Sequence, residues 1–369
     1  MRRGAVVVLL LGLLSGQAGA VVVLDSTWKA EGGGAGHEAA GFSAHIRLAH
    51  KPQFRALMAM SESRGKAVWG VGSATWIGND ADHGYVLTAA HVFTGSPKDV
   101  RGYIYRADDG TIYRAASITT PPGWNSDLEA RTGYDFAIVQ LTRPVTGIGP
   151  APALYAGRLE AGKVLTFMGY GERGIGSVGQ HERFYEGSDK AAAQGLIEEV
   201  VPLRHPMPKS GDAGGYLGIF LPKEDGSVAG PYKGPRKPVS RLAGLLGSGD
   251  SGGSAWVEIG GIWAIAGINS SGSGGDATGY GNQAWFARVS DQQDWIKAQA
   301  PMARWVGDTA SASAPACTLG VAVSVLWEGD WYPAHVRGPM ARGLCPIRYD
   351  DFDSEWDEAV GPDRMRQPR

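Results

Sequence analysis

Three residues that together could cleave a bond by nucleophilic attack stand in short, distinctive contexts. His91 ends the run Leu-Thr-Ala-Ala-His, Asp135 precedes the apolar run Phe-Ala-Ile-Val-Gln-Leu, and Ser251 lies in the loop Gly-Ser-Gly-Asp-Ser-Gly-Gly-Ser. A serine hydroxyl is a poor nucleophile until a neighbouring imidazole removes its proton, and the histidine pKa lies near neutrality. A buried carboxylate can fix the imidazole tautomer and stabilise the imidazolium. The sequence therefore predicts a triad of His91, Asp135 and Ser251.

The glycines that flank the serine have a predicted role of their own. Glycine allows a sharp backbone turn, so that two amide groups can point at one spot. We expect the amides of Gly249 and Ser251 to form an oxyanion hole, in which each donor lowers the barrier by about 3–4 kcal/mol. A second loop, Ser-Gly-Asp-Ala-Gly-Gly, copies this pattern but has Ala213 where a nucleophile would stand, so it is interpreted as a turn.

Each of these contexts also has an ordinary explanation. A histidine after a strand can be a surface or core residue, an aspartate before a strand can be a turn residue, and a glycine-rich loop can be only a loop. Their joint occurrence in the order His, Asp, Ser favours catalysis.

With these motifs the chain resembles the trypsin-like serine proteases of the chymotrypsin fold. That family is marked by Thr-Ala-Ala-His, Asp-x-Ala-x-x-x-Leu and Gly-Asp-Ser-Gly-Gly, and all three stand here in the family's order. The resemblance covers roughly residues 67–300. It implies an all-β fold of two six-stranded antiparallel barrels with the triad in the cleft between them and a helix at the end. It also implies a serine endopeptidase that works through an acyl-enzyme without a cofactor.

The same resemblance assigns the substrate site. Ser270 would lie behind the aspartate, and residues 270–272 would pair with the substrate backbone. Leu245, six residues before the nucleophile, would form the floor of the specificity pocket, with Gly272 and Ala284 on its walls. An uncharged floor cannot neutralise a buried lysine or arginine side chain. We therefore expect a preference for apolar residues before the cleaved bond.

Asp250 raises the question of activation. In the family this aspartate is buried against a freshly exposed amino terminus, because a buried carboxylate needs a partner. No start of the Ile-Val-Gly-Gly type occurs between Val21 and Ala67. Either an unrecognised cut frees such a terminus or another residue serves.

The elements that must hold the triad residues are predicted to be strands. Short apolar runs separated by turn residues occur at 68–78, 85–89, 136–141, 164–168 and 261–268, without long helices between them. This pattern favours antiparallel barrels or sandwiches over a parallel sheet. One helix is expected over 291–299, with Ser290 as its N-cap and Pro301 as its stop.

The first twenty residues have the pattern of a cleavable export signal. Arg2 and Arg3 precede an apolar run, and Ala-Gly-Ala at 18–20 matches a small-x-small cleavage site. The alternative is an uncleaved anchor, but Ser15, Gly16 and Gln17 interrupt the stretch of roughly 20 apolar residues that a span needs. A secreted or periplasmic protein without a stable membrane anchor is expected. We divide the rest into a lead-in (21–66), which includes a mobile segment rich in glycine and alanine, the protease domain (67–300), a linker (301–316) and a small domain (317–369).

The small domain resembles the Tudor-knot or Agenet-like barrels in its Trp-Tyr-Pro-Ala-x-Val and Val-Gly-Pro-Asp-Arg stretches. Two interpretations of its aromatic residues stay open: a cage that holds a cationic side chain, or simply the core of a very small barrel. The residues concerned are Trp331, Tyr349, Phe352 and Trp356. Cys317 and Cys345, the two cysteines of the chain, would pair in an oxidising compartment or remain free thiols.

Other functional classes find less support. A formal net charge of −2 gives no electrostatic case for nucleic acid. No His-Glu-x-x-His or comparable ligand cluster indicates a metal site. The expected partners are a protein or peptide substrate and a protein or cell-surface ligand for the small barrel. Two rival hypotheses are an inactive protease homologue that only binds and an adhesion module that acts through the barrel.

Overall fold

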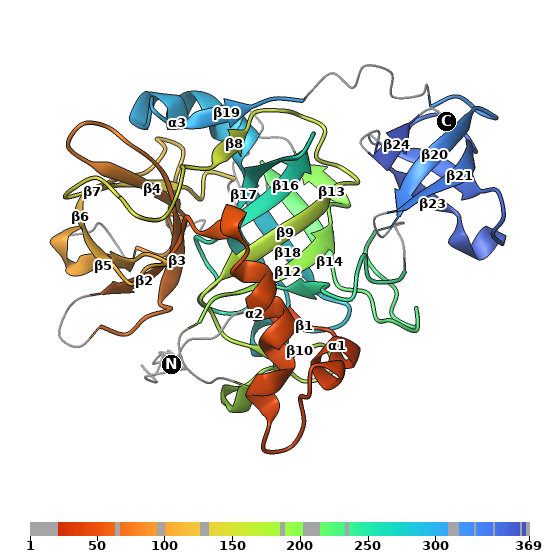
Figure 1. The fold of residues 1–369 in the computed structure, drawn as a ribbon, viewed down its shortest axis with the longest axis horizontal. Coiled ribbons are helices and arrows are strands. Elements are labelled where there is room, and N and C mark those ends of the chain that lie inside the picture. Colours follow the sequence, from red (N-terminus) through yellow and green to blue (C-terminus); the bar gives the residue numbers. More distant parts are fainter. Residues whose placement is uncertain are drawn as a thin grey trace, which may run out of the picture.

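The computed structural model describes residues 21–62, 67–93, 100–125, 133–184, 189–201, 215–232, 236–308, 317–327, 330–341, 344–361 and 364–366. The predicted signal and the loop with Ala213 lie outside the described residues. β-Sheets dominate and gather into three units along the chain: a first barrel, a second curled sheet and a small C-terminal sheet (Figure 1). The predicted all-β class is confirmed.

The first barrel is closed and antiparallel, with strand order β2-β3-β4-β7-β6-β5. The strands predicted near 68–78, 85–89 and 136–141 correspond to β3, β4 and β7. β2 lies before residue 67, where the domain was expected to begin, and is nevertheless a barrel strand. The strands are β2 (Leu57–Glu62), β3 (Gly72–Asn79), β4 (Gly84–Thr88), β5 (Tyr103–Arg106), β6 (Ile112–Thr119) and β7 (Ala137–Leu141).

The second unit contains six strands in the order β12-β9-β16-β17-β18-β14, and β13 extends it past β14. The sheet curls, so that β12 and β14 approach each other. A Cβ on Gly195 of β12 would lie only 2.6 Å from Ile219 Cδ1 of β14. In the described residues, hydrogen bonds close only the first barrel, so this second barrel is open. Its strands are β9 (Val164–Gly169), β12 (Ala191–Leu196), β13 (Glu199–Val201), β14 (Tyr216–Phe220), β16 (Ser254–Ile259), β17 (Ile262–Gly272) and β18 (Gln283–Arg288).

The N-terminal segment packs into the second unit. β1 (Val22–Val23) lies between β10 (Gly174–Ile175), to which it is parallel, and β15 (Gly244–Leu245), to which it is antiparallel, and β11 (Gly179–Gln180) completes the sheet. α1 (Asp25–Ala30) and α2 (Ser43–Ala49) follow (Figure 1). Residues 21–24 are buried in the core of the second unit. The lead-in is therefore held in part by the core that supports the site.

The predicted terminal helix begins later than expected. A 3-10 turn over Val289–Gln292 precedes α3 (Gln293–Gln299), and no side chain caps the helix. The prediction that Ser290 is the N-cap is wrong, because its hydroxyl donates to Glu160 Oε1 at 3.0 Å inside the protein. Leaving a buried carboxylate without a donor is costly, so this contact engages the hydroxyl that would otherwise be free to cap the helix. β19 (Arg304–Val306) then pairs with β8 (Ala153–Tyr155) on the second sheet.

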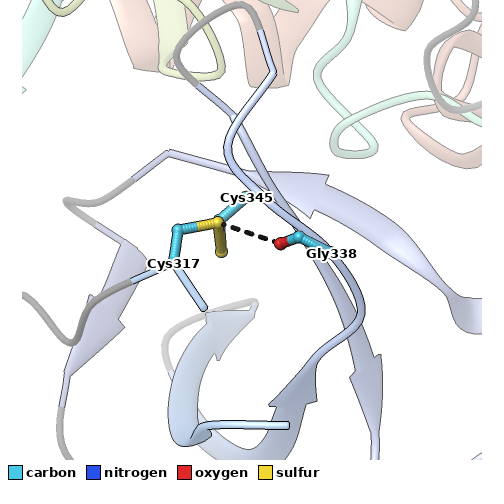
Figure 2. Close-up of a disulfide and its surroundings, with 3 residues drawn as sticks. All are labelled: Cys317, Gly338 and Cys345. Carbon is cyan, nitrogen blue, oxygen red and sulfur yellow. Dashed lines mark hydrogen bonds between the residues drawn. A yellow bond between two sulfur atoms is a disulfide. The ribbon is translucent and has the colours of Figure 1, made fainter. Parts of the chain in front are cut away.

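The C-terminal unit is a five-stranded antiparallel sheet of order β23-β22-β21-β20-β24, drawn in blue in Figure 1. Cys317 and Cys345 form a disulfide across it, with Cα atoms 5.6 Å apart, and the Cys317 sulfur lies 3.5 Å from the Gly338 carbonyl oxygen (Figure 2). The strands are β20 (Ala322–Trp327), β21 (Asp330–Val336), β22 (Cys345–Tyr349), β23 (Glu358–Val360) and β24 (Met365–Arg366).

Candidate active site

The structure brings His91, Asp135 and Ser251 into one hydrogen-bonded row. His91 Nε2 lies 2.7 Å from Ser251 Oγ, and His91 Nδ1 lies 2.7 Å from Asp135 Oδ2. The His91 backbone amide also donates to Asp135 Oδ1 at 2.9 Å. The carboxylate is fully buried and the imidazole is about one-quarter exposed. This arrangement can move a proton from the hydroxyl to the ring while the carboxylate fixes the ring's tautomer.

Strand pairing explains how two of these residues meet. β4 and β7 are antiparallel neighbours, and Thr88 is paired with Ala137. His91 follows β4 and Asp135 precedes β7, so both residues leave the first barrel at the same end. One pair of strands thus bridges a sequence separation of 44 residues.

Ser251 comes from the second unit, in the loop between β15 and β16. Ser73 of β3 connects this loop to the first barrel. Its amide donates to the Ser251 carbonyl at 2.8 Å, and its hydroxyl donates to the Gly249 carbonyl at 3.4 Å. The same hydroxyl accepts the Tyr170 amide at 3.0 Å. Sequence reasoning missed Ser73, because only tertiary structure brings β3 to the loop.

A fourth side chain completes the surroundings of the carboxylate. Ser270 Oγ donates to Asp135 Oδ2 at 2.6 Å. The pairing of β17 with β18 shifts register between Asn269 and Ser271, at Ser270 itself. Such a bulge changes the direction of a side chain. Ser270 was expected to lie behind the aspartate, and the structure places its hydroxyl against the same carboxylate oxygen that faces His91 Nδ1.

The loop around Ser251 depends on two glycines with positive φ. Gly249 has a φ of +85° and Gly252 a φ of +78°, a region that other residues rarely adopt. Gly252 also has no room for a side chain, since a Cβ there would clash with Thr88 Oγ1. Within the described residues, no acceptor is bonded to the amides of Gly249 and Ser251. These two donors are available for an oxyanion.

Asp250, next to the nucleophile, points into the protein and is fully buried. Its carboxylate accepts the amides of Gly247 at 2.7 Å, Gly171 at 3.0 Å and Val21 at 3.2 Å. Burial raises the pKa of Asp250 to about 7, against the opposing effect of these donors. Sequence reasoning did not select Val21, although it directly follows the predicted export cut.

The predicted pocket residues lie in two places. Gly272 of β17 is paired with Ala284 of β18, and Gly272 is exposed while Ala284 is buried. Leu245 is fully buried in β15 and paired with Val22, and it belongs to the same apolar core as Ala284. The structure therefore pairs the two wall residues directly and places the predicted floor next to the N-terminal strand.

Comparison with known proteins identifies the domain. The family model described as the trypsin-like peptidase domain matches residues 72–256, which include the histidine, aspartate and serine of the site. No curated protein matches the chain. In the part of the chain that the structure describes, no helix is long and apolar enough to span a membrane. The same residues contain no cluster of histidine, cysteine and acidic side chains arranged to hold a metal ion.

Proposed function

The chain belongs to the family of trypsin-like peptidase domains, and from this premise we propose that it is an exported serine endopeptidase that uses His91, Asp135 and Ser251. Ser251 Oγ attacks the peptide carbonyl while His91 Nε2 takes its proton, and Asp135 stabilises the imidazolium. The amides of Gly249 and Ser251 bind the oxyanion. His91 then protonates the leaving amine, and water hydrolyses the acyl-enzyme by the reverse sequence. The 2.7 Å contact between His91 Nε2 and Ser251 Oγ carries this proposal.

A fluorophosphonate probe, which reacts only with an activated serine, tests the assignment. We expect labelling of the wild type and none of Ser251→Ala, while Ser117→Ala on β6 serves as the matched control and labels normally. An absence of labelling in correctly folded wild type would favour the inactive homologue. Labelling that persists in Ser251→Ala would exclude this serine as the nucleophile.

Substrate preference and location belong to the same proposal. The predicted pocket floor, Leu245, is apolar and lies in an apolar core, which supports cleavage after uncharged apolar residues. Export to the periplasm or the medium is supported by the signal-like residues 1–20. Profiling with a peptide library tests the preference, and cleavage confined to sites after lysine or arginine would refute it.

We further propose that the C-terminal unit, which resembles Tudor-knot barrels, binds cationic side chains of a protein partner. The carrying observation is a cluster of edge-to-face or tilted rings whose outer members, Phe352 and Trp356, are 37% and 42% exposed. Lys237 of the second unit has its Nζ 5.5 Å from the centroid of Trp356. The cluster consists of Trp327, Tyr332, Tyr349, Phe352 and Trp356.

The rings of this cluster differ in their exposure to solvent. Tyr349 is buried and belongs to the core of the unit, whereas the two outer rings face solvent. Trp331 is the neighbour of Tyr332 on β21, so the two side chains point to opposite faces. Titration with a lysine-rich peptide should quench tryptophan fluorescence, and Trp356→Ala should abolish binding. Equal binding of a glutamate-rich peptide would contradict a cation site.

A further inference from the structure

Val21 holds an unusual position at the base of the nucleophile loop. It is fully buried, and its backbone nitrogen lies 3.2 Å from Asp250 Oδ2. Its φ is +66°, and Val21 is the one non-glycine residue of the described chain with a positive φ. For a β-branched residue this conformation is strained as long as a residue precedes it. A residue at the start of a chain has no such restriction, because no preceding carbonyl exists to clash.

Asp250 lacks a cationic partner within the described chain. Its three side-chain hydrogen bonds come from backbone amides, and no lysine, arginine or histidine of the described residues lies within ion-pair distance. Burial therefore raises its pKa to about 7, and the charge of Arg173 is the weakest of the effects that oppose this rise. The site is suited to a positive charge placed where the Val21 nitrogen already lies.

The N-terminal strand connects this position to the catalytic loop. Val22 and Val23 of β1 are paired with Leu245 and Gly244 of β15, and β15 leads directly into the loop. The Gly247 amide at the start of the loop donates to the same Asp250 oxygen as Val21 does. Whatever fixes the Val21 nitrogen also fixes the stretch of chain that presents Gly249 and Ser251.

We infer that the cut that removes the export signal, between Ala20 and Val21, is also the step that completes the active site. Hydrolysis of this peptide bond by the signal peptidase of the exporting cell consumes one water and leaves a carboxylate on Ala20 and an ammonium group on Val21. The ammonium pairs with the Asp250 carboxylate. No separate propeptide has to be removed, and the enzyme stays inert until it has left the compartment of its synthesis.

This inference rests on the proposed peptidase activity, and the length of the N-terminus tests it. Three forms are released from a removable fusion partner: one that begins at Val21, one with an added glycine before Val21, and one that begins at Val22. We expect the added or missing residue to lower kcat/KM about 100-fold or more, the loss typical of a buried charge without its partner. Equal activity of the three forms would overturn the inference and leave the peptidase intact. Failure of all three to react with a fluorophosphonate would instead refute the peptidase.

A stability measurement tests the inference independently of enzymatic activity. In the Ser251→Ala background, chains that begin at Val21 are compared with a free and with an acetylated α-amine. With acetylation Asp250 keeps a raised pKa, so this form is most stable when the group is protonated and loses stability as pH rises from about 4 to about 7. With the free amine, the ion pair prevents this loss until the amine itself deprotonates at higher pH.

We therefore expect the free-amine form to melt about 5 °C or more above the acetylated form at pH 7, with a smaller difference at pH 4. In Asp250→Asn the advantage of the free amine should vanish. Identical melting temperatures of the two forms of the Asp250 protein at pH 7 would overturn the inference.

Discussion

At the scale of single residues, Ser270 tests how much the proposed catalytic carboxylate, Asp135, depends on its hydrogen-bond donors. Asp135 is fully buried and accepts the His91 amide, His91 Nδ1 and the Ser270 hydroxyl. Ser270→Ala removes one donor, so we expect kcat/KM to fall about 10-fold, the effect of one hydrogen bond to a buried charged group. Ser270→Thr keeps the hydroxyl and should recover most of the activity. An alanine variant with unchanged kcat/KM would contradict this role.

Leu245 is the residue on which the predicted specificity depends. Leu245→Asp would place a carboxylate at the expected floor of the pocket, where it can neutralise a lysine or arginine side chain. We expect the ratio of kcat/KM for arginine over leucine substrates to rise about 10-fold or more, and peptide-library profiling measures it. Leu245→Asn, of the same size but uncharged, is the control and should not gain this preference. If both variants behave alike, Leu245 does not contact the substrate side chain.

At the scale of elements, Gly252 tests how tightly the nucleophile loop is built. Alanine there would be strained at a φ of +78° and would clash with Thr88 Oγ1. Gly261→Ala is a matched control, because Gly261 has a φ of +84° but open space around it. We expect the control to lose about 1–2 kcal/mol of unfolding free energy and Gly252→Ala to lose at least 1 kcal/mol more. Urea unfolding measures both, and equal losses would show that the loop can move aside.

Strands were predicted well and their surroundings less well. The strand at 136–141 could be predicted because a buried strand is apolar over its whole length, and this run forms β7. The start of the terminal helix could not be predicted, because the contact of Ser290 with Glu160 is a tertiary contact that leaves no signal in the local sequence. The role of Val21 was hidden for the same reason, since it depends on the insertion of β1 between β10 and β15. Motifs predicted the triad, whereas strand pairing decides which residues surround it.

At the scale of the whole molecule, the site is assembled from two units and leaves the third outside it. The first barrel supplies His91 and Asp135, and the second supplies Ser251 and Ser270. The C-terminal unit meets the second at Gly162, where a side chain would clash with Leu344. In the described part of the chain, no hydrogen bond, ion pair or ring contact joins the C-terminal unit to the site residues. The proposed peptidase activity and the proposed ligand binding can therefore be tested separately.

The disulfide offers that separation. The chain has two cysteines, and their bond closes a loop over a sequence separation of 28 residues in the C-terminal unit alone. By the chain-entropy model, removing the bond costs about 3–4 kcal/mol, most of what so small a unit possesses. Reduction should therefore unfold the C-terminal unit at a lower temperature while fluorophosphonate labelling of Ser251 persists, because both β units around the triad fold without disulfides.

Calorimetry with and without reductant measures the lower unfolding temperature, and the double variant Cys317→Ala/Cys345→Ala should reproduce it. Loss of labelling on reduction would mean that the three units fold as one, since the cysteines lie far from the nucleophile in the sequence and in a different unit.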